Sequence, residues 1–598
     1  MCGISGVVAT NGREEERAQR AVSVMNDAQS RRGPDDSGTW SSAKRTVIFG
    51  HRRLSIIDLS PDSHQPMAYG TLRITFNGEI YNYAELKQEL SSKGHAFRTK
   101  SDTEVIMAGY REWGADSFLK LRGMFAFALH DEATDETILV RDRFGIKPLY
   151  YYDSGDTLVF ASTVGALKAS GLVPTDEDEQ WKTAFMLFGY LPHPLTTLKQ
   201  VRPLDAGSYL IKDKEGRTEI KRYFDPLEPF LKKQNLSKEE AARAVRKALE
   251  ESVRYHLVAD APLGVFLSGG LDSSILASLA SRARREPVNT LSIDFKEAAF
   301  SEKKYREGLV RKIKSAHTEV LVSAEDFYKA FPDILSAMDQ PSVDAVNTYF
   351  VARAAREAGL VAVLSGLGSD ELFFGYKHFR TARMFHMLQA LPRVLKWSLL
   401  IVSRFWGKLA RLEYLYHRGA LPRYLTARGL FSPREVVRAT GVSMQEIGRL
   451  IHTIAVTHGL NDPRVARLAP EDQISLMELM FYLKGQLLKD SDFMSMHSSI
   501  EVRVPFLDNE LVALLASLSP QLKFGVANKE LLVRATEDII PREVWDRQKM
   551  GFTFPFAEWL KAAPANLVAG ANKALFERFR AGTIHWSRFW ASVVSHSI

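Results

Sequence analysis

Residues 264–274, with the sequence Gly-Val-Phe-Leu-Ser-Gly-Gly-Leu-Asp-Ser-Ser, have the residue types of a phosphate-binding turn. The apolar residues before position 268 are typical of a buried strand, and from Leu271 onward apolar side chains recur at helical spacing. Small residues separate the two, namely Ser268, Gly269 and Gly270. Glycine permits positive φ and a close approach of backbone N–H groups to a ligand, and the first turn of a helix attracts anions. We therefore expect an anion cradle, to which the hydroxyls of Ser273 and Ser274 add donors.

Asp272 distinguishes this turn from a plain glycine-rich loop. A carboxylate beside phosphates is repulsive unless a cation lies between them, so Asp272 is a candidate Mg²⁺ ligand. The structural alternative is a Gly-Gly turn with ordinary Ser and Asp capping of a helix. The segment ends in no Gly-Lys-Ser/Thr and lacks the Gly-x-Gly-x-x-Gly spacing of dinucleotide folds. It resembles the S-G-G-x-D-S pyrophosphate loop of ATP pyrophosphatases, which implies cleavage of ATP into AMP and pyrophosphate.

Cys2 is the single cysteine of the chain, and its position suggests nucleophilic chemistry. An isolated cysteine is usually a small buried hydrophobe. Removal of Met1 would instead place a thiol and a free α-amine on one residue. An α-amine with a pKa of about 7.7–8.0 is a suitable general base at neutral pH. Nucleophile and base would then come together, as in N-terminal nucleophile enzymes.

Several segments that follow Cys2 form a recognisable series. Each is unremarkable alone, since Asn77 and Gly78, for example, could form a hairpin turn. The segments are 2–7, 32–35 (Arg-Gly-Pro-Asp), 51–58 (His-Arg-Arg-Leu-Ser-Ile-Ile-Asp), 76–82 (Phe-Asn-Gly-Glu-Ile-Tyr-Asn), 101–104 (Ser-Asp-Thr-Glu) and 141–151. Together, in this order, they resemble the class II glutamine amidotransferase domain, from Cys2 to about residue 205. The resemblance implies an N-terminal-nucleophile αββα sandwich.

The resemblance also implies a role for each polar residue of the first site, and the residue types suit glutamine. A guanidinium matches the α-carboxylate of glutamine, which points to Arg53. Glu79 and Asp102 match the α-ammonium group. A tetrahedral intermediate needs hydrogen-bond donors, so Asn77 and the backbone N–H of Gly78 would form the oxyanion hole, with Asn77 also in contact with glutamine.

The second half of the chain reads as alternating helices and strands. Ser237 and Glu240 form a capping-box pattern that opens a helix, and the apolar runs 290–295 and 361–364 read as buried strands. Strands separated by helical stretches predict a doubly wound parallel sheet whose ligand lies at the carboxyl ends of the strands. The overall class is therefore α/β and multidomain.

The strand at 361–364 runs into a second glycine-rich turn, 365–373, with the sequence Ser-Gly-Leu-Gly-Ser-Asp-Glu-Leu-Phe. This turn and residues 495–507 resemble asparagine synthetases, and Lys529 falls where that family has a lysine that contacts pyrophosphate. The implied ATP contacts are Leu267, Ser268, Gly269, Gly270, Asp272, Ser273, Ile293, Ser365, Gly366 and Lys529, and the implied Mg²⁺ ligands are Asp272 and Asp370.

Leu367 departs from the family pattern, which has Glu in that turn, and Phe374 replaces a usual glycine. Leucine can neither hold a cation nor move a proton. Either another carboxylate such as Glu371 or Asp344 serves instead, or the substrate's own groups suffice, or the acceptor pocket has been reshaped for something larger or less polar than aspartate.

The two resemblances together predict an amidotransferase with two active sites. Glutamine would release ammonia at the first site, and ATP would activate a carboxylate as an acyl-adenylate at the second. Free aspartate is the family's usual acceptor; another carboxylate is the alternative, and a non-catalytic partner protein is a weaker one. We expect a glutaminase domain at 1–205, a linker at 206–235 and a synthetase domain at 236–598. The stretch 381–469 matches the family poorly and reads as mostly helical.

Composition agrees with a globular enzyme. The chain has 598 residues, 45% of them hydrophobic, and a net charge of +8 without any block of five or more like charges, which disfavours nucleic-acid binding. The apolar run 394–406 is interrupted by polar residues and is far shorter than the ~20 residues of a membrane span. One cysteine and the lack of a signal-peptide pattern predict a cytoplasmic protein. A homodimer is one assembly that the family allows.

Overall fold

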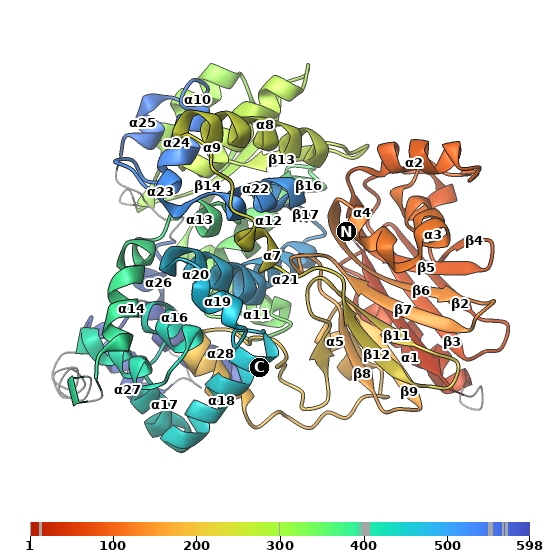
Figure 1. Ribbon diagram of the computed structural model, residues 1–598, viewed down its shortest axis with the longest axis horizontal. Coiled ribbons are helices and arrows are strands. Elements are labelled where there is room, and N and C mark those ends of the chain that lie inside the picture. The colour runs from red at the N-terminus through yellow and green to blue at the C-terminus, as the bar shows by residue number, and fades with distance from the viewer. Residues whose placement is uncertain are drawn as a thin grey trace.

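The computed structural model describes residues 2–10, 15–297, 300–392, 394–395, 407–547, 554–564, 567 and 572–597. Two parts lie against each other in Figure 1, an antiparallel sandwich built by the first 220 or so residues and a larger part built around a parallel sheet. The chain start lies between the two parts. Most of the apolar run 394–406 falls outside the described residues.

The sandwich consists of two six-stranded sheets. The first has the order β10-β8-β9-β1-β3-β2, with β1 (Gly3–Ala9), β2 (Asp36–Ser41), β3 (Val47–Arg53), β8 (Tyr150–Asp153), β9 (Thr157–Ala161) and β10 (Arg202–Pro203). The second has the order β12-β11-β7-β6-β5-β4, with β4 (Met67–Tyr69), β5 (Leu72–Ile80), β6 (Gly123–Asp131), β7 (Glu136–Arg141), β11 (Ser208–Lys212) and β12 (Thr218–Arg222).

Alternating side chains hold the layers of the sandwich together. On β1, Ile4 and Val8 pack between the two sheets with Phe49 and Leu139, whereas Val7 faces the helical layer, as a period of two requires. The helices are α1 (Glu15–Ala28), α2 (Tyr83–Ser92), α3 (Asp102–Trp113), α4 (Ser117–Lys120), α5 (Val164–Ala169) and α6 (Trp181–Phe188). Helix α1 packs on the first sheet and α3 on the second, so the predicted αββα layering is confirmed.

Strands β11 and β12 fall inside the segment 206–235 that the sequence suggests as a linker. Both belong to the second sheet, where β11 pairs with β7 and β12 pairs with β11. All five residues of β12 are exposed, so the sheet of the first part continues beyond residue 205.

The second part contains a five-stranded parallel sheet with the order β15-β14-β13-β16-β17. Its strands are β13 (Leu263–Phe266), β14 (Asn289–Phe295), β15 (Ala316–Val322), β16 (Ala362–Leu364) and β17 (Glu501–Arg503). Its associated helices are α7 (Glu228–Leu231), α8 (Lys238–His256), α9 (Leu271–Ala283), α10 (Lys303–Ile313), α11 (Ala324–Ala337), α12 (Val346–Glu357) and α13 (Ser369–Leu372). The predicted parallel sheet is confirmed, as is the capping box at Ser237. The strand order reverses at β13, and ligands bind at such a switch point.

Helices make up most of what the structure describes after β16. They are η5 (Lys377–Thr381), α14 (Ala382–Ala390), η6 (Gly407–Tyr416), α16 (Ala420–Arg428), α17 (Pro433–Thr440), α18 (Met444–Thr457), α19 (Pro463–Arg467), α20 (Pro470–Met477), the π-helix η7 (Glu478–Leu487) and α21 (Leu488–His497). After β17 come η8 (Pro505–Leu507), α22 (Asn509–Ser517), α23 (Pro520–Lys523), α24 (Glu530–Thr536), α25 (Arg542–Trp545), α26 (Phe556–Lys561), α27 (Lys573–Arg580) and α28 (Trp586–Ser597). Within the described ranges, no helix combines the length and apolarity that crossing a membrane requires.

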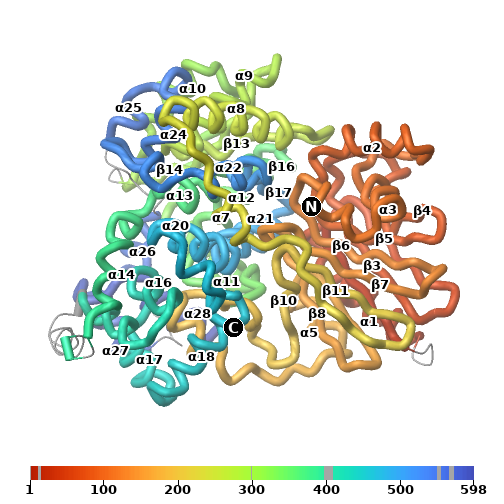
Figure 2. The backbone as a smooth tube through the Cα atoms, viewed as in Figure 1, coloured from red at the N-terminus to blue at the C-terminus, as the bar shows by residue number. Residues whose placement is uncertain are grey.

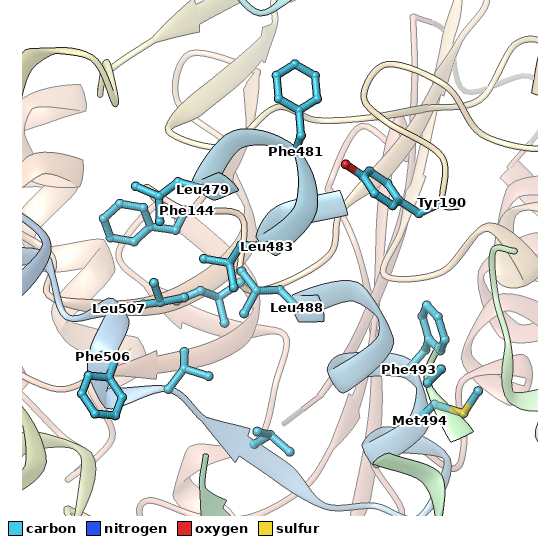
Figure 3. Packing of buried hydrophobic residues seen from close by; sticks show 14 of the residues in the cluster. Phe144, Tyr190, Leu479, Phe481, Leu483, Leu488, Phe493, Met494, Phe506 and Leu507 are labelled. Atoms are coloured by element: carbon cyan, nitrogen blue, oxygen red, sulfur yellow. The ribbon is translucent and has the colours of Figure 1, made fainter. Parts of the chain in front are cut away.

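A continuous apolar core joins the two parts. Leu54, Tyr81 and Phe144 of the sandwich belong to the same buried cluster as residues around the parallel sheet. Figure 3 shows this cluster, with Phe144 in the same view as Leu479 of η7 and Leu507 of η8. Burying apolar surface stabilises the contact by about 25 cal/mol per Å², so the two parts are held in one relative position.

Candidate active sites

The first candidate site gathers around the start of β1. Cys2 precedes β1, Arg53 ends β3, Asn77 and Glu79 lie in β5, and Asp102 is the first residue of α3. The backbone nitrogen of Cys2 donates a hydrogen bond of 3.0 Å to Asn77 Oδ1. Sheet pairing brings β1 beside β3 and packs β1 against β5. Residues that the sequence spreads over a hundred positions therefore meet at one place.

Cys2 is buried, with 8% of its surface exposed. Burial raises the pKa of the Cys2 thiol, and the backbone N–H of Leu54 and the guanidinium of Arg53 partly oppose that rise. A thiol whose pKa is raised needs a base to become a nucleophile. A free α-amine on the same residue would supply that base.

Asn77 and Gly78 lie inside β5, so the hairpin-turn alternative is wrong. Their strand pairs with β6, Asn77 opposite Ala126 and Gly78 opposite Phe125. Gly78 has φ of +153°, and a Cβ there would stand 2.1 Å from the carbonyl oxygen of Met124. Asn77 Nδ2 is buried and has no hydrogen-bond partner among the described residues. An unpaired donor beside the thiol is suited to receiving a developing oxyanion.

Arg53 is held by a turn of its own chain. Its guanidinium donates to the carbonyl oxygens of Ser60, at 3.0 Å, and of Asp58. Asp58 has φ of +54°, and its carboxylate accepts hydrogen bonds from the backbone and hydroxyl of Ser60. Arg53 also lines a surface depression with Asp36. The turn fixes a cation near Cys2, where the carboxylate of glutamine would need one.

Glu79 and Asp102 are two buried carboxylates of the first site. Asp102 accepts a hydrogen bond of 2.8 Å from the backbone of Ile80, and burial raises its pKa to about 6. Burial, and next the charge of Glu501, raise the pKa of Glu79 well above its usual value, whereas Arg503 lowers it. An incoming ammonium group would stabilise both carboxylates in their charged form.

The second candidate site is a cavity of about 300 Å³ at the carboxyl ends of β13, β14 and β16. Most of the ATP-contact residues inferred from the sequence line it, namely Leu267, Ser268, Gly270, Asp272, Ser273, Ile293, Ser365, Gly366 and Lys529, and Asp370 joins them. Gly269 lies in the turn behind the lining; it has φ of +90°, and its carbonyl oxygen accepts a hydrogen bond of 3.1 Å from Arg547.

The turn before α9 has the geometry expected of an anion cradle. Gly270 caps α9, a helix of 13 residues. The backbone N–H of Gly270 donates to Ser268 Oγ at 3.2 Å, and the hydroxyls of Ser268 and Ser273 lie 3.1 Å apart. The helix N-terminus and both hydroxyls therefore face the same end of the cavity.

Lys529 lies between the two candidate metal-binding carboxylates. Its Nζ is 2.7 Å from each carboxylate oxygen of Asp272 and 2.8 Å from Asp370 Oδ1. Burial opposes the charged form of this lysine, but Asp272 and Asp370 outweigh burial and raise the pKa of Lys529. The cluster is thus two carboxylates that converge on one cation, at the phosphate end of the cavity.

Gly375 lies directly against Asp370 and Lys529 of that cluster. A Cβ at this position would stand 1.8 Å from Asp370 Oδ1 and 2.5 Å from Lys529 Cε. Both atoms belong to side chains that can move, so the Gly375→Ala change should displace charged groups more than it destabilises the fold. We expect pyrophosphate release to fall by about tenfold or more in a coupled assay, while glutamine hydrolysis is unchanged.

Gly308 provides the matched control for that prediction. It lies in α10, and a Cβ there meets no atom within 4 Å. Gly308→Ala should leave both activities as in the wild type. Normal pyrophosphate release by the Gly375→Ala enzyme would contradict a role for the Asp370–Lys529 pair.

Leu367 lines the cavity, and neither proposed substitute carboxylate does. Glu371 is 1% exposed, and it accepts a hydrogen bond of 2.7 Å from the hydroxyl of Tyr376. Burial raises the pKa of Glu371 to about 7. Asp344 is likewise outside the lining, and burial raises its pKa. Neither carboxylate therefore belongs to the cavity lining, so the substitution of Glu371 or Asp344 for the missing glutamate stays a prediction.

Several lining residues escaped the sequence interpretation. They are Asn347, Thr348, Ser491, Asn528, Trp545 and Arg547. Asn347 and Thr348 come from the first turn of α12, whereas Trp545 ends α25 and Arg547 follows it. No local pattern marks such residues, because the fold alone brings them to the strand ends.

The helical stretch 381–469 contacts the surroundings of the second cavity through Arg428. This arginine, at the end of α16, makes two hydrogen bonds of 2.8 and 2.7 Å to the buried carboxylate of Glu478. Its guanidinium lies 4.2 Å from the ring centre of Tyr376 and 3.7 Å from that of Tyr482. Tyr376 in turn donates a hydrogen bond to Glu371, which is next to Asp370, so the stretch contacts residues directly behind the cavity lining.

Charged side chains cross the boundary between the two parts. Arg32 of the sandwich donates two hydrogen bonds, of 2.7 and 3.2 Å, to Asp492 of α21 and one of 3.2 Å to the carbonyl oxygen of Cys2. Arg122 contacts both carboxylate oxygens of Asp508 at 2.6 and 2.8 Å. The contacts of Arg32 connect the first site to α21, whose residue Ser491 lines the second cavity.

Comparison with known proteins gives consistent matches over both parts. Residues 1–224 match the glutamine amidotransferase domain family, and residues 244–580 match the asparagine synthase family. A Mycobacterium tuberculosis (strain H37Rv) relative, provisionally named a glutamine-hydrolysing asparagine synthetase, is 36% identical over 592 residues, which cover 94% of this chain and 89% of the relative. Asparagine synthetase 1 (glutamine-hydrolysing) of Bacillus subtilis (strain 168) is 33% identical over 573 residues, which cover 94% and 88%.

Among solved structures, glutamine phosphoribosylpyrophosphate amidotransferase from B. subtilis, complexed with ADP and GMP, matches 55% of this chain and 92% of its own. The sequence identity is 17% and the TM-score 0.29. That TM-score is too low to support a conclusion.

Proposed function

Because the chain belongs to the family of glutamine-hydrolysing asparagine synthetases, we propose that it transfers the amide nitrogen of glutamine to a carboxylate, with aspartate as the first candidate acceptor. The reaction consumes ATP and yields AMP and pyrophosphate. The observation that carries this proposal is the pairing of two sites in one chain, a buried cysteine at position 2 and a phosphate cradle at the switch point of a parallel sheet. The proposal places the enzyme in the cytoplasm, where ATP and glutamine are available.

At the first site, Cys2 would attack the side-chain amide of glutamine. The α-amine of Cys2 would take the thiol proton and pass it to the leaving nitrogen, so that ammonia departs and a thioester remains. Asn77 Nδ2 and the N–H of Gly78 would stabilise the tetrahedral oxyanion. Water would then cleave the thioester into glutamate and the free thiol. Arg53, Glu79 and their partners would hold the amino-acid end of glutamine.

At the second site, the acceptor carboxylate would attack the α-phosphate of ATP and release pyrophosphate. This step makes sense because a carboxylate is a poor electrophile, whereas an acyl-adenylate has AMP as a good leaving group. Ammonia would attack the acyl carbon, lose a proton and displace AMP. The cradle before α9 and the ammonium of Lys529 support binding of the phosphates at the end of the cavity that they occupy.

The donor set at this end fits Mg²⁺. Two carboxylates, Asp272 and Asp370, converge within hydrogen-bond distance of one cationic group, and Mg²⁺ in nucleotide sites is typically held by one or two carboxylates together with phosphate oxygens. Asp272 and Asp370 would hold the ion, which would neutralise charge on the departing pyrophosphate. Lys529 would keep both carboxylates charged and oriented before ATP binds.

The product nucleotide gives a direct test of the proposal. The enzyme, supplied with ATP, Mg²⁺, ammonium and a panel of carboxylates, should produce AMP and pyrophosphate in equal amounts with an amide. Production of ADP and phosphate would refute acyl-adenylate chemistry. A protein that binds ATP and glutamine without turnover of either would be a non-catalytic partner.

Leu367 favours a second candidate acceptor, a carboxylate other than free aspartate. It places an aliphatic side chain in the cavity at a position that the family pattern gives to glutamate, and neither Glu371 nor Asp344 reaches the lining. If the pocket has been reshaped, aspartate is a poor substrate for the wild type. Amide formation from aspartate at a turnover of about 1–10³ s⁻¹ would exclude this second candidate.

Leu367→Glu should then improve the use of aspartate. Restoring a carboxylate supplies a group that can move a proton, and general acid–base groups contribute about 10²–10⁴-fold, so we expect kcat/KM for aspartate to rise by at least tenfold. Leu367→Gln has nearly the same shape without the charge and should give no such rise. An equal effect of the two substitutions, or none, would contradict the prediction. Asparagine formed from aspartate, ATP and glutamine is the quantity to measure.

A further inference from the structure

Arg503 lies between the two active sites and contacts both neighbourhoods. It ends β17, the edge strand of the parallel sheet, which lies on the side of the sheet toward the sandwich in Figure 2. Its backbone belongs to the second site, because β17 pairs with β16 and the carbonyl oxygen of Arg503 accepts a hydrogen bond of 2.8 Å from the backbone N–H of Ser365. Ser365 is the first residue of the turn that lines the cavity with Leu367.

The side chain of Arg503 reaches into the first site. It is fully buried, and Nη1 donates to the carbonyl oxygens of His256 and Val258 at 2.8 and 2.6 Å. Nε donates to Glu501 at 2.6 Å. These contacts fix the guanidinium plane and leave Nη2 directed at Glu79 Oε2, 3.4 Å away.

The contact between Arg503 and Glu79 is close but incomplete. A charge-assisted hydrogen bond between such groups is usually about 2.7–2.9 Å long, and neither Nη2 nor Oε2 has a hydrogen-bond partner within the described part of the chain. Leaving two buried charged atoms this way is costly. A small shift of either side chain would therefore make or break the bond.

Arg503 favours the charged form of Glu79 against the effect of burial. Burial, and next the charge of Glu501, raise the pKa of Glu79, and among the groups that lower it Arg503 has the largest effect. Only an ionised Glu79 can pair with the ammonium group of glutamine. Glu501 and Asp102 both raise the pKa of Glu79. A neutral side chain at position 503 would remove the positive charge that opposes them.

We propose that Arg503 is a positioning residue that couples the two sites: it holds Glu79 oriented for glutamine, and it transmits movement of the Ser365–Leu367 turn to that carboxylate through the paired strands β16 and β17. This inference rests on the proposed role of Glu79 in glutamine binding. Occupancy of the second site by ATP and acceptor shifts the turn, and through Arg503 it changes the affinity for glutamine. Linkage requires the reverse effect as well, so glutamine changes the affinity for ATP by the same factor.

The test compares Arg503→Gln and Arg503→Lys with the wild type by measuring kcat and KM for glutamine hydrolysis. The assay is run with and without ATP, Mg²⁺ and the carboxylate that gives the fastest pyrophosphate release. In the wild type, these ligands should change KM for glutamine by about fivefold or more, within the usual range of allosteric coupling. Arg503→Gln should raise KM by about tenfold or more, change kcat little and abolish the response to ATP. Arg503→Lys keeps the positive charge but lacks the planar guanidinium and its fixed donor geometry, so it should restore part of the affinity for glutamine.

Arg122→Gln is the matched control, because Arg122 also pairs across the boundary, with Asp508, but has no contact with Glu79. It should leave KM for glutamine and its response to ATP unchanged. Ammonium-dependent synthesis reports whether each variant is folded and should be retained in all of them.

Several outcomes would overturn the proposal. These are an unchanged KM in a folded Arg503→Gln enzyme, a wild-type KM that ignores ATP and acceptor, and an Arg122→Gln variant with the same defect. If Arg503→Gln does not fold, the test rests on Arg503→Lys. A KM for glutamine and a response to ATP equal to those of the wild type in that variant would refute the coupling. Failure of the proposed function is distinguishable, because the wild type would then not hydrolyse glutamine at all.

Discussion

Cys2→Ala is expected to abolish glutamine-dependent amide synthesis while synthesis from ammonium salts continues. The substitution removes the nucleophile of the first site, and loss of a nucleophile typically costs on the order of 10⁴-fold or more. The second cavity contains no atom of Cys2. Glutamate release and amide formation, each measured with glutamine and with ammonium, check the prediction.

An extra residue retained before Cys2 should have nearly the same effect, because it converts the α-amine into a peptide nitrogen and removes the base. The backbone nitrogen of Cys2 already lies 3.0 Å from Asn77 Oδ1, so a free amine would be held in place there. Loss of ammonium-dependent synthesis in Cys2→Ala would show that the two sites are not separate, and retained glutaminase activity would show that another group is the nucleophile.

Asp272→Asn should reverse that pattern, with glutamine hydrolysis measurable and pyrophosphate release lost. The change removes a carboxylate from the cluster in which Lys529 contacts Asp272 and Asp370. Groups that act on charge developing in the transition state typically contribute about 10²–10³-fold, or 2.7–4 kcal/mol. Pyrophosphate release with ATP, Mg²⁺ and ammonium is the measurement.

Lys529→Ala should weaken the same step by leaving the two carboxylates without their cation. Raising the Mg²⁺ concentration should recover part of the activity in Asp272→Asn if the lost function is metal binding. The Cys2→Ala enzyme is the reciprocal control, since it should release pyrophosphate normally with ammonium. Normal pyrophosphate release by both Asp272→Asn and Lys529→Ala would place the nucleotide elsewhere.

Local patterns predicted the elements that position the second site. The apolar run before Ser268 and the helical spacing after Leu271 correspond to β13 and α9, and the capping box at Ser237 opens α8. Each signal is local, because strand burial, helical periodicity and capping all depend on neighbours within one or two turns.

Other features depend on contacts between distant segments, which a single sequence does not reveal. Asn77 and Gly78 fit a hairpin turn by residue type, but pairing with β6 makes them part of a strand. Strand β12 is exposed throughout, so it carries no alternation to mark it. Strand β17 has three residues, too few for a period, and the contact of Arg503 with Glu79 spans more than four hundred positions.

Arg428, whose guanidinium lies against the rings of Tyr376 and Tyr482, affects how this protein unfolds. Glu478 is fully buried and shared by Arg428 and His378, and stripping the partner from a buried ion pair typically costs 3–5 kcal/mol. The helices around α16 therefore cannot separate from the parallel sheet without leaving an unpaired charge in the interior. The stretch therefore shares one cooperative melting unit with the strands that border the second cavity. Substitutions within it can alter catalysis without touching any residue of the cavity.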